Sequence, residues 1–197
     1  GVCDTVIHNG YDALMLACSE GNLSIVSKLL MHSGFKINKR AYNQLTSLMI
    51  AVQQNHQPIV EMLLLRGVNI KKRANNRVTV LMIAVDRGNI GIIKLLLKHG
   101  VPIDDKDQAG ETALMIAVRK GNTEIVLLLI SHGATLEQVE NSGYSALMFA
   151  SGMGHYELVR LLISKGGAGN IDAKENDGLT ALMIATIGCH ITIVSLL

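Results

Sequence analysis

The sequence contains seven histidines and three cysteines, and these side chains are the usual ligands of zinc and common nucleophiles and bases in catalysis. No His or Cys pair has the spacing of a zinc site. Three histidines instead recur at one place, one or two residues before a glycine: His32, His99 and His132. A repeated position favours capping of the last carbonyls of a helix over metal binding, which is the alternative. We therefore expect no metal, no cofactor and no catalytic residue.

The three cysteines are far apart in the sequence: Cys3, Cys18 and Cys189. An odd, scattered set argues against a disulfide framework and favours a reducing compartment. We expect the cytoplasm, with the nucleus as the alternative. Cys18 stands where other copies of a repeat have Val52, Val85 and Val118, so we expect it in the core rather than as a nucleophile.

The repeat becomes visible when the chain is compared with itself. Residues 112–117, Thr-Ala-Leu-Met-Ile-Ala, recur at 180–185, and looser copies occupy 12–17, 46–51, 79–84 and 145–150. The leucines of these copies are separated by 34, 33, 33, 33 and 35 residues, a period that predicts a solenoid. The two longer spacings predict insertions near residues 33–34 and 166–169.

Each copy contains two apolar blocks with helical spacing. Leu114, Ala117 and Val118 lie at i, i+3 and i+4, and a second block begins at Ile125. Glycines such as Gly121 follow the blocks, and turn-forming clusters separate the copies at 107–110, 141–143 and 176–178. With 49% apolar and 3% aromatic residues, the composition also suits closely packed helices. The pattern predicts two short antiparallel helices per copy.

The period of turn, helix and helix, with Gly-Asn-Thr-Glu-Ile-Val at residues 121–126, resembles the ankyrin repeat across residues 7–197. The resemblance implies an all-α solenoid of stacked helix-turn-helix units with projecting β-turn fingers. We divide this single domain, residues 1–197, into six repeats: 7–40, 41–73, 74–106, 107–139, 140–174 and 175–197. The last repeat is truncated and ends on an apolar edge, so we expect the natural protein to continue.

One departure from the family concerns the first helices. The family usually has Thr-Pro-Leu-His, whose His links neighbouring turns, whereas this chain has methionine at that position, as at Met82 and Met115. We expect the thioethers to fill the gap by packing alone, with fewer polar ties between turns.

The resemblance implies a protein-interaction scaffold rather than an enzyme. The alternative is a regulatory or substrate-recruiting segment of a larger enzyme or membrane channel protein. Members of the family bind another protein or peptide through the finger tips and the exposed side of the first helices. That face corresponds here to Tyr11, Tyr42, Leu45, Gln54, Asn76, Val78, Asp86, Arg87, Glu111, Arg119, Lys120, Tyr144 and Met153.

The net charge of +2 conceals an asymmetry along the chain. Residues 1–100 contain 12 Lys and Arg against 5 Asp and Glu, and residues 101–197 contain 6 against 11. We expect a partner with its acidic end toward repeats 1–3, although charge that only keeps the array soluble is the alternative. The basic part lacks interleaved aromatic residues, so no nucleic acid is expected.

A membrane span is the alternative for residues 178–197, which lack Asp, Glu, Lys and Arg. Polar residues interrupt the segment, however, and its register matches five earlier copies. We therefore expect no membrane insertion, and a monomeric segment of a longer chain.

Overall fold

The computed structural model describes residues 10–32, 36–166 and 171–197. Within these residues it contains twelve α-helices and one short 3-10 helix. The helices form two compact units, residues 1–102 and 103–197, each of which is described by itself. The insertion predicted near 33–34 lies outside the described residues, as does the one predicted near 166–169 except for Gly166.

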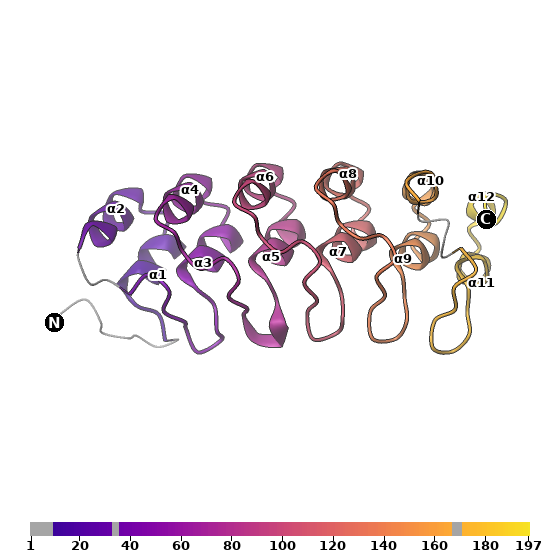
Figure 1. Cartoon of the computed structure of the whole chain (residues 1–197), viewed down its shortest axis with the longest axis horizontal. Coiled ribbons are helices and arrows are strands. Elements are labelled where there is room, and N and C mark those ends of the chain that lie inside the picture. The colour runs from indigo at the N-terminus through magenta and orange to yellow at the C-terminus, as the bar shows by residue number, and fades with distance from the viewer. Residues whose placement is uncertain (1–9, 33–35, 167–170) are drawn as a thin grey trace. The chain divides into compact units, whose positions relative to one another are not determined.

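Unit 1 consists of three helix pairs. The first helices of the pairs are α1 (Ala13–Ser19), α3 (Ser47–Gln53) and α5 (Val80–Arg87). The second helices are α2 (Leu23–Met31), α4 (Gln57–Leu65) and α6 (Ile90–Lys98). Within this unit the first helices pack side by side, as do the second helices, and the turns project from the side of the first helices (Figure 1). The short helix η1 (Asn75–Arg77) lies in the turn before α5.

Unit 2 has the same organisation. Its first helices are α7 (Ala113–Arg119), α9 (Ala146–Gly152) and α11 (Ala181–Ile187). Its second helices are α8 (Thr123–Ser131), α10 (Tyr156–Ser164) and α12 (Ile191–Val194). None of the helices in the described residues has the length and apolar character that a membrane crossing requires.

A capping side chain stands at the start of each first helix. The Thr112 hydroxyl accepts a hydrogen bond from the Met115 amide at 3.3 Å, which satisfies an amide that has no partner inside the helix. Every first helix begins in this way, with caps at Asp12, Thr46, Thr79, Thr112, Ser145 and Thr180. A side-chain oxygen, from a hydroxyl in five helices and from the Asp12 carboxylate in α1, therefore sets where each first helix starts.

The core lies between the two rows of helices in each unit. Leu114 and Met115 of α7 are 1% exposed, and Ile125 of α8 is fully buried. Helices of seven to nine residues are marginal alone, so their stability comes from packing against neighbouring helices. In repeat 6 the equivalent Leu182 and Met183 are 42% and 48% exposed, because no helix pair covers that side within the described residues. The predicted all-α repeat fold is confirmed.

The methionines of the first helices do more than fill space. The Sδ atoms of Met82 and Met148 each accept a hydrogen bond from the backbone amide of the capping residue, Thr79 and Ser145, at 3.4 Å. The expectation that these thioethers act by packing alone is therefore wrong at these two helices. A sulfur acceptor takes the place that a Glu or Gln side chain has in a capping box.

Candidate protein-binding surface

Each described first helix after α1 is preceded by a five-residue hairpin turn, which we call a finger and number by its repeat. Fingers 2 to 6 are residues 41–45, 74–78, 107–111, 140–144 and 175–179. In each finger the amide of the first residue donates to the carbonyl of the fifth, at 2.9 to 3.0 Å. This closing bond holds the tip at a set position above the start of its helix.

Neighbouring fingers within a unit are also linked to each other. In unit 1 the Asn75 amide donates to the Asn43 carbonyl at 3.1 Å. In unit 2 the Asn141 amide donates to the Ala109 carbonyl at 2.9 Å, and the Asn141 side chain donates to the Gln108 carbonyl at the same distance. Asn176 continues the pattern. Hydrogen bonds therefore connect neighbouring fingers, and their donors are backbone amides and asparagine side chains.

Among the predicted contact residues of unit 1, Tyr42 is the most exposed aromatic side chain, at 73%. A Cβ on Gly10 would come within 2.8 Å of the Tyr42 ring, so the ring lies against the preceding turn on one side. Four further predicted residues are exposed: Gln54, Asn76, Asp86 and Arg87. Three are half-buried: Tyr11, Leu45 and Val78. The exposed set belongs to the fingers and to the ends of α3 and α5.

In unit 2 two of the predicted contact residues bind each other. The Arg119 guanidinium donates two hydrogen bonds to the Glu111 carboxylate, at 3.2 and 3.1 Å. This two-point ion pair joins finger 4 to the end of α7. Because Arg119 is 41% exposed, the pair contributes little to stability, and its effect is to orient both side chains.

The remaining predicted residues of unit 2 differ in accessibility. Lys120 and Met153 are exposed at the ends of α7 and α9, with Met153 at 52%. Tyr144 is half-buried, and its ring lies 5.4 Å from the ring of Phe149, a tilted aromatic pair. Tyr144 is therefore partly committed to packing within its own repeat.

The acidic residues of unit 2 close their own fingers. The Glu140 carboxylate accepts hydrogen bonds from the amides of Ser142 and Tyr144, at 2.9 and 3.0 Å. Glu175 accepts from Asp177 and Leu179 in the same way, and Asp107 accepts from Glu111. Part of the negative charge of unit 2 is thus structural, which the sequence analysis did not recognise.

Comparison with known proteins agrees with this architecture. The family model described as ankyrin repeats in three copies matches residues 1–74, 48–140 and 134–197. The chain belongs to the ankyrin repeat family. A crystal structure of an ankyrin repeat domain from Acinetobacter baumannii AYE is similar, with a TM-score of 0.85 and 26% identity, over 93% of this chain and 94% of that one. No curated protein sequence matches the chain.

Three histidines of this ankyrin array link consecutive repeats. The Nε2 atoms of His56, His155 and His190 lie 3.2, 3.4 and 3.0 Å from the carbonyl oxygens of Ser19, Arg119 and Gly152. Since a carbonyl only accepts, the imidazole donates in each case. The sequence analysis assigned no role to these three histidines. The detectable signal was a glycine 34 to 36 residues before each histidine: Gly21, Gly121 and Gly154.

The histidines expected to cap second helices behave differently from one another. His132 Nδ1 lies 2.9 Å from the Leu128 carbonyl, so its ring caps α8 as predicted. The rings of His32 and His99 make no hydrogen bond within the described residues, and these residues cap through their backbone amides instead. No group of three His, Cys, Asp or Glu side chains suited to a metal occurs in the described parts of the chain.

The two described cysteines occupy opposite environments. Cys18 is fully buried in α1, as predicted, whereas Cys189 is exposed. Burial, with a smaller contribution from the nearby Asp12 carboxylate, raises the pKa of the Cys18 thiol to about 12. Such a thiol stays protonated at neutral pH, so its chemistry is that of a small core residue.

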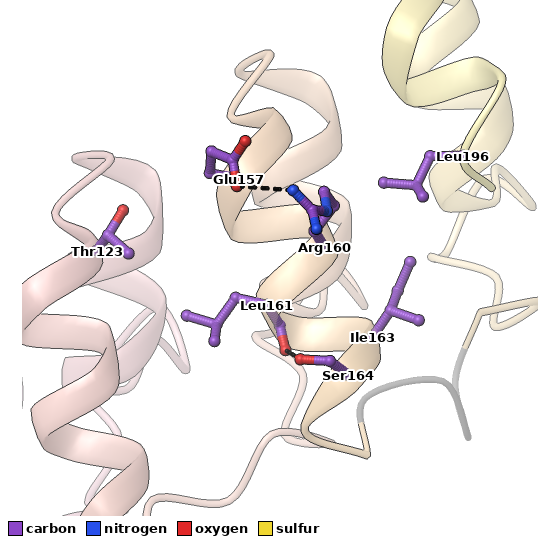
Figure 2. Close-up of a pocket in the computed structure, with 7 residues that line it drawn as sticks. All are labelled: Thr123, Glu157, Arg160, Leu161, Ile163, Ser164 and Leu196. Carbon is purple, nitrogen blue, oxygen red and sulfur yellow. Dashed lines mark hydrogen bonds and ion pairs between the residues drawn. The ribbon is translucent and has the colours of Figure 1, made fainter.

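Unit 2 also carries a shallow groove on its second helices, far from the finger tips. The groove has a volume of about 440 Å³ and is lined by residues of α10 together with Thr123 and Leu196. In Figure 2 the Leu161 side chain points toward Thr123, and the Ile163 side chain lies on the side of Leu196. The polar groups of the groove are largely paired, because Arg160 contacts Glu157 at 3.4 Å and the Ser164 hydroxyl donates to the Leu161 carbonyl. The groove therefore offers few convergent polar groups to orient a small ligand.

Proposed function

We propose that this ankyrin repeat chain is a protein-interaction scaffold that binds a partner protein or peptide through its fingers and the ends of its first helices. Ankyrin repeats are generally protein-interaction modules, which supports this class of function. The proposed contact residues are the thirteen named in the sequence analysis.

The observation that carries this proposal is the position of Tyr42. Its side chain is 73% exposed, yet its ring lies against Gly10 and its finger is hydrogen-bonded to the next finger. A large aromatic side chain held in place loses little conformational entropy when a partner covers it, which is why tyrosine is frequent among interface anchors.

The charge distribution supports an acidic end on the partner. Unit 1 carries a net charge of +7 over residues 1–100, and its fingers are flanked by Lys71 and Lys72. A positive field attracts an acidic segment and orients it before contact, with a larger effect on the association rate than on affinity.

The proposed compartment is the cytoplasm or nucleus. Cys18 and Cys189 are free thiols, one buried in the core and one exposed. Free thiols at both cysteines of the described residues suit a reducing compartment.

The proposal is tested by affinity capture with the chain and two single variants. Tyr42→Ala removes the exposed finger tyrosine, and Tyr156→Ala removes a tyrosine on α10, which lies on the second-helix face. A captured protein that is lost with Tyr42→Ala and kept with Tyr156→Ala supports the proposed face. Equal retention by both variants would place the binding surface elsewhere.

A further inference from the structure

The fingers of the two units differ at the first of their five residues. Fingers 4, 5 and 6 begin with an acid whose carboxylate accepts amides of the same finger: Asp107, Glu140 and Glu175. Fingers 2 and 3 begin with Ala41 and Ala74, which offer no such acceptor. The unit 2 fingers therefore carry a negative charge at their first residue, whereas those of unit 1 carry none there, and in finger 2 the Asn43 Oδ1 accepts the Leu45 amide instead.

The fingers also differ at their fourth residue. In repeats 1, 4, 5 and 6 this residue is a glycine with positive φ: Gly10, Gly110, Gly143 and Gly178. Fingers 2 and 3 instead have Gln44 and Arg77, with φ of 62° and 60°. A side chain makes this left-handed conformation costly, and only glycine adopts it freely. Fingers 2 and 3 therefore have a strained residue at their fourth position, where the other four repeats have glycine.

Finger 3 is the more unusual of the two. Asn76 also has a positive φ of 56°, and the Val78 amide donates to the Asn75 carbonyl at 3.3 Å. Two successive positive φ values define a type I′ turn, for which Asn-Gly is the preferred central pair. Arginine stands where that glycine is expected. A strained backbone conformation is often found where the side chain takes part in function. The positive φ of Arg77 therefore motivates a functional hypothesis for its side chain.

The two strained residues present hydrogen-bond donors on adjacent fingers. The Asn75 amide is bonded to the Asn43 carbonyl, which sets fingers 2 and 3 side by side. The Gln44 Oε1 accepts from Arg40 at 2.9 Å, so the carboxamide is oriented and its NH₂ group remains to donate. The Arg77 side chain is exposed and has no hydrogen bond or ion pair within the described residues.

The charged residues around these fingers are mainly basic, and Asp86 at the end of α5 is an exposed exception. Between residues 36 and 85 the only carboxylate side chain is Glu61, and it lies on the second helix α4. Exposed cations of the same stretch include Lys36, Arg40, Lys71 and Arg77. A ligand that satisfies exposed donors in a positive field is an extended acidic peptide, whose carboxylates and backbone carbonyls are acceptors.

We infer that fingers 2 and 3 are the specificity-determining contact of this chain, with Gln44 and Arg77 recognising an extended acidic segment of the partner. The inference rests on the proposed function and assigns the recognition to these fingers rather than to those of unit 2. Nucleic acid is the competing ligand for a basic surface, and the test includes it.

The test uses the whole chain and a library of ten-residue peptides that carry four Asp or Glu residues, beside the same library with Lys at those positions. The chain is expected to select acidic members. For a selected peptide, Gln44→Gly and Arg77→Gly should each lower the affinity at least about fivefold while the melting temperature stays equal or rises, because glycine relieves the left-handed strain. Arg77→Lys keeps the charge and should lose less.

The matched control is Gln108→Ala in finger 4, which removes an exposed amide and leaves the carbonyl that Asn141 uses. It should bind the selected peptide like the unaltered chain. No preference for acidic over lysine peptides, tighter binding of a twelve-nucleotide single-stranded DNA, or glycine variants that bind unchanged would each overturn the inference. So would an affinity loss that merely follows a loss of melting temperature.

The same variants distinguish failure of this inference from failure of the proposed function. A captured protein that depends on Tyr42 and is indifferent to Gln44→Gly and Arg77→Gly would keep the binding face and remove the role of the strained residues. A protein indifferent to all three changes would remove both.

Discussion

The imidazole Nε2 of His190 lies 3.0 Å from the carbonyl oxygen of Gly152, and the same ring covers the Cα of Gly154. The ring thus joins the second helix of repeat 6 to the end of the first helix of repeat 5. A carbonyl at a helix end has no partner inside the helix, so a donor from the next repeat satisfies it. Only a residue without Cβ lets the His190 ring come this close. The position of the histidine ring therefore depends on a glycine at position 154.

This coupling predicts that Gly154→Ala is more destabilising than an alanine at another left-handed glycine. A Cβ at Gly154 would lie 2.6 Å from the His190 ring, whereas at Gly133, with φ of +90°, it would meet nothing within 4 Å. Gly133→Ala should therefore cost only the backbone strain, about 1–2 kcal/mol. Gly154→Ala should cost about 1–3 kcal/mol more because the ring must move. Urea unfolding measures both.

Adding His190→Ala to Gly154→Ala should recover part of the extra loss, since the clash disappears with the ring. Equal losses for the two single glycine variants would mean that the ring contact imposes no constraint.

A second prediction concerns Ser151 in α9, whose buried hydroxyl has no hydrogen-bond partner among the described residues. The equivalent positions of three other repeats have valine. Ser151→Ala should raise the free energy of unfolding by about 1 kcal/mol, because an unsatisfied buried polar group is removed and alanine favours helix.

Ser145→Ala is the contrasting variant, because the Ser145 hydroxyl accepts the Met148 amide at 3.3 Å. Its loss should destabilise the chain by about 1 kcal/mol. Thermal unfolding that moves in the same direction for both variants would contradict the assigned roles of the two hydroxyls.

The helix positions could be predicted because two local rules agree at each repeat. A hydroxyl residue such as Thr112 caps the helix start, and apolar residues at i, i+3 and i+4 from Leu114 form the buried side. Both signals depend only on neighbours in the sequence, and the period of 33 residues repeats them.

The candidate surface was less predictable because it depends on side-chain contacts that the repeat register does not specify. Register places Tyr144 on the predicted binding face, but no local signal shows that its ring packs on Phe149. Charge counting likewise treats Glu140 as surface charge, although its carboxylate closes a finger. The left-handed conformation of Gln44 and Arg77 could have been suspected, since glycine occupies that register in the other four repeats.

A third prediction follows from the pKa of Cys18, which burial and the nearby Asp12 carboxylate raise to about 12 in the folded chain. In the unfolded chain the thiol loses its proton near pH 8.5, whereas in the folded chain it keeps it. Above that pH the unfolded state binds fewer protons, so stability falls as the pH rises toward 12. Between pH 8 and 10 the loss from this residue should be about 2 kcal/mol.

Cys18→Val is the control for this titration, because valine occupies the equivalent position in other repeats and has no proton to lose. The difference in unfolding free energy between the two proteins should change by the stated amount across the pH range, since other groups titrate equally in both. A constant difference would show that Cys18 is solvated in the folded state.

The last prediction concerns the positive charge of unit 1. Lys71→Glu with Lys72→Glu changes the net charge near finger 3 by four and should slow association with the true partner about tenfold at low salt. Lys94→Glu with Lys98→Glu makes the same change on α6, on the second-helix face, and is the matched control. At 0.5 M salt the difference between the pairs should vanish, because screening shortens the reach of the field to a few ångströms. If both pairs slow association equally, only total charge matters, and the position of the lysines beside the finger has no role in orienting the partner.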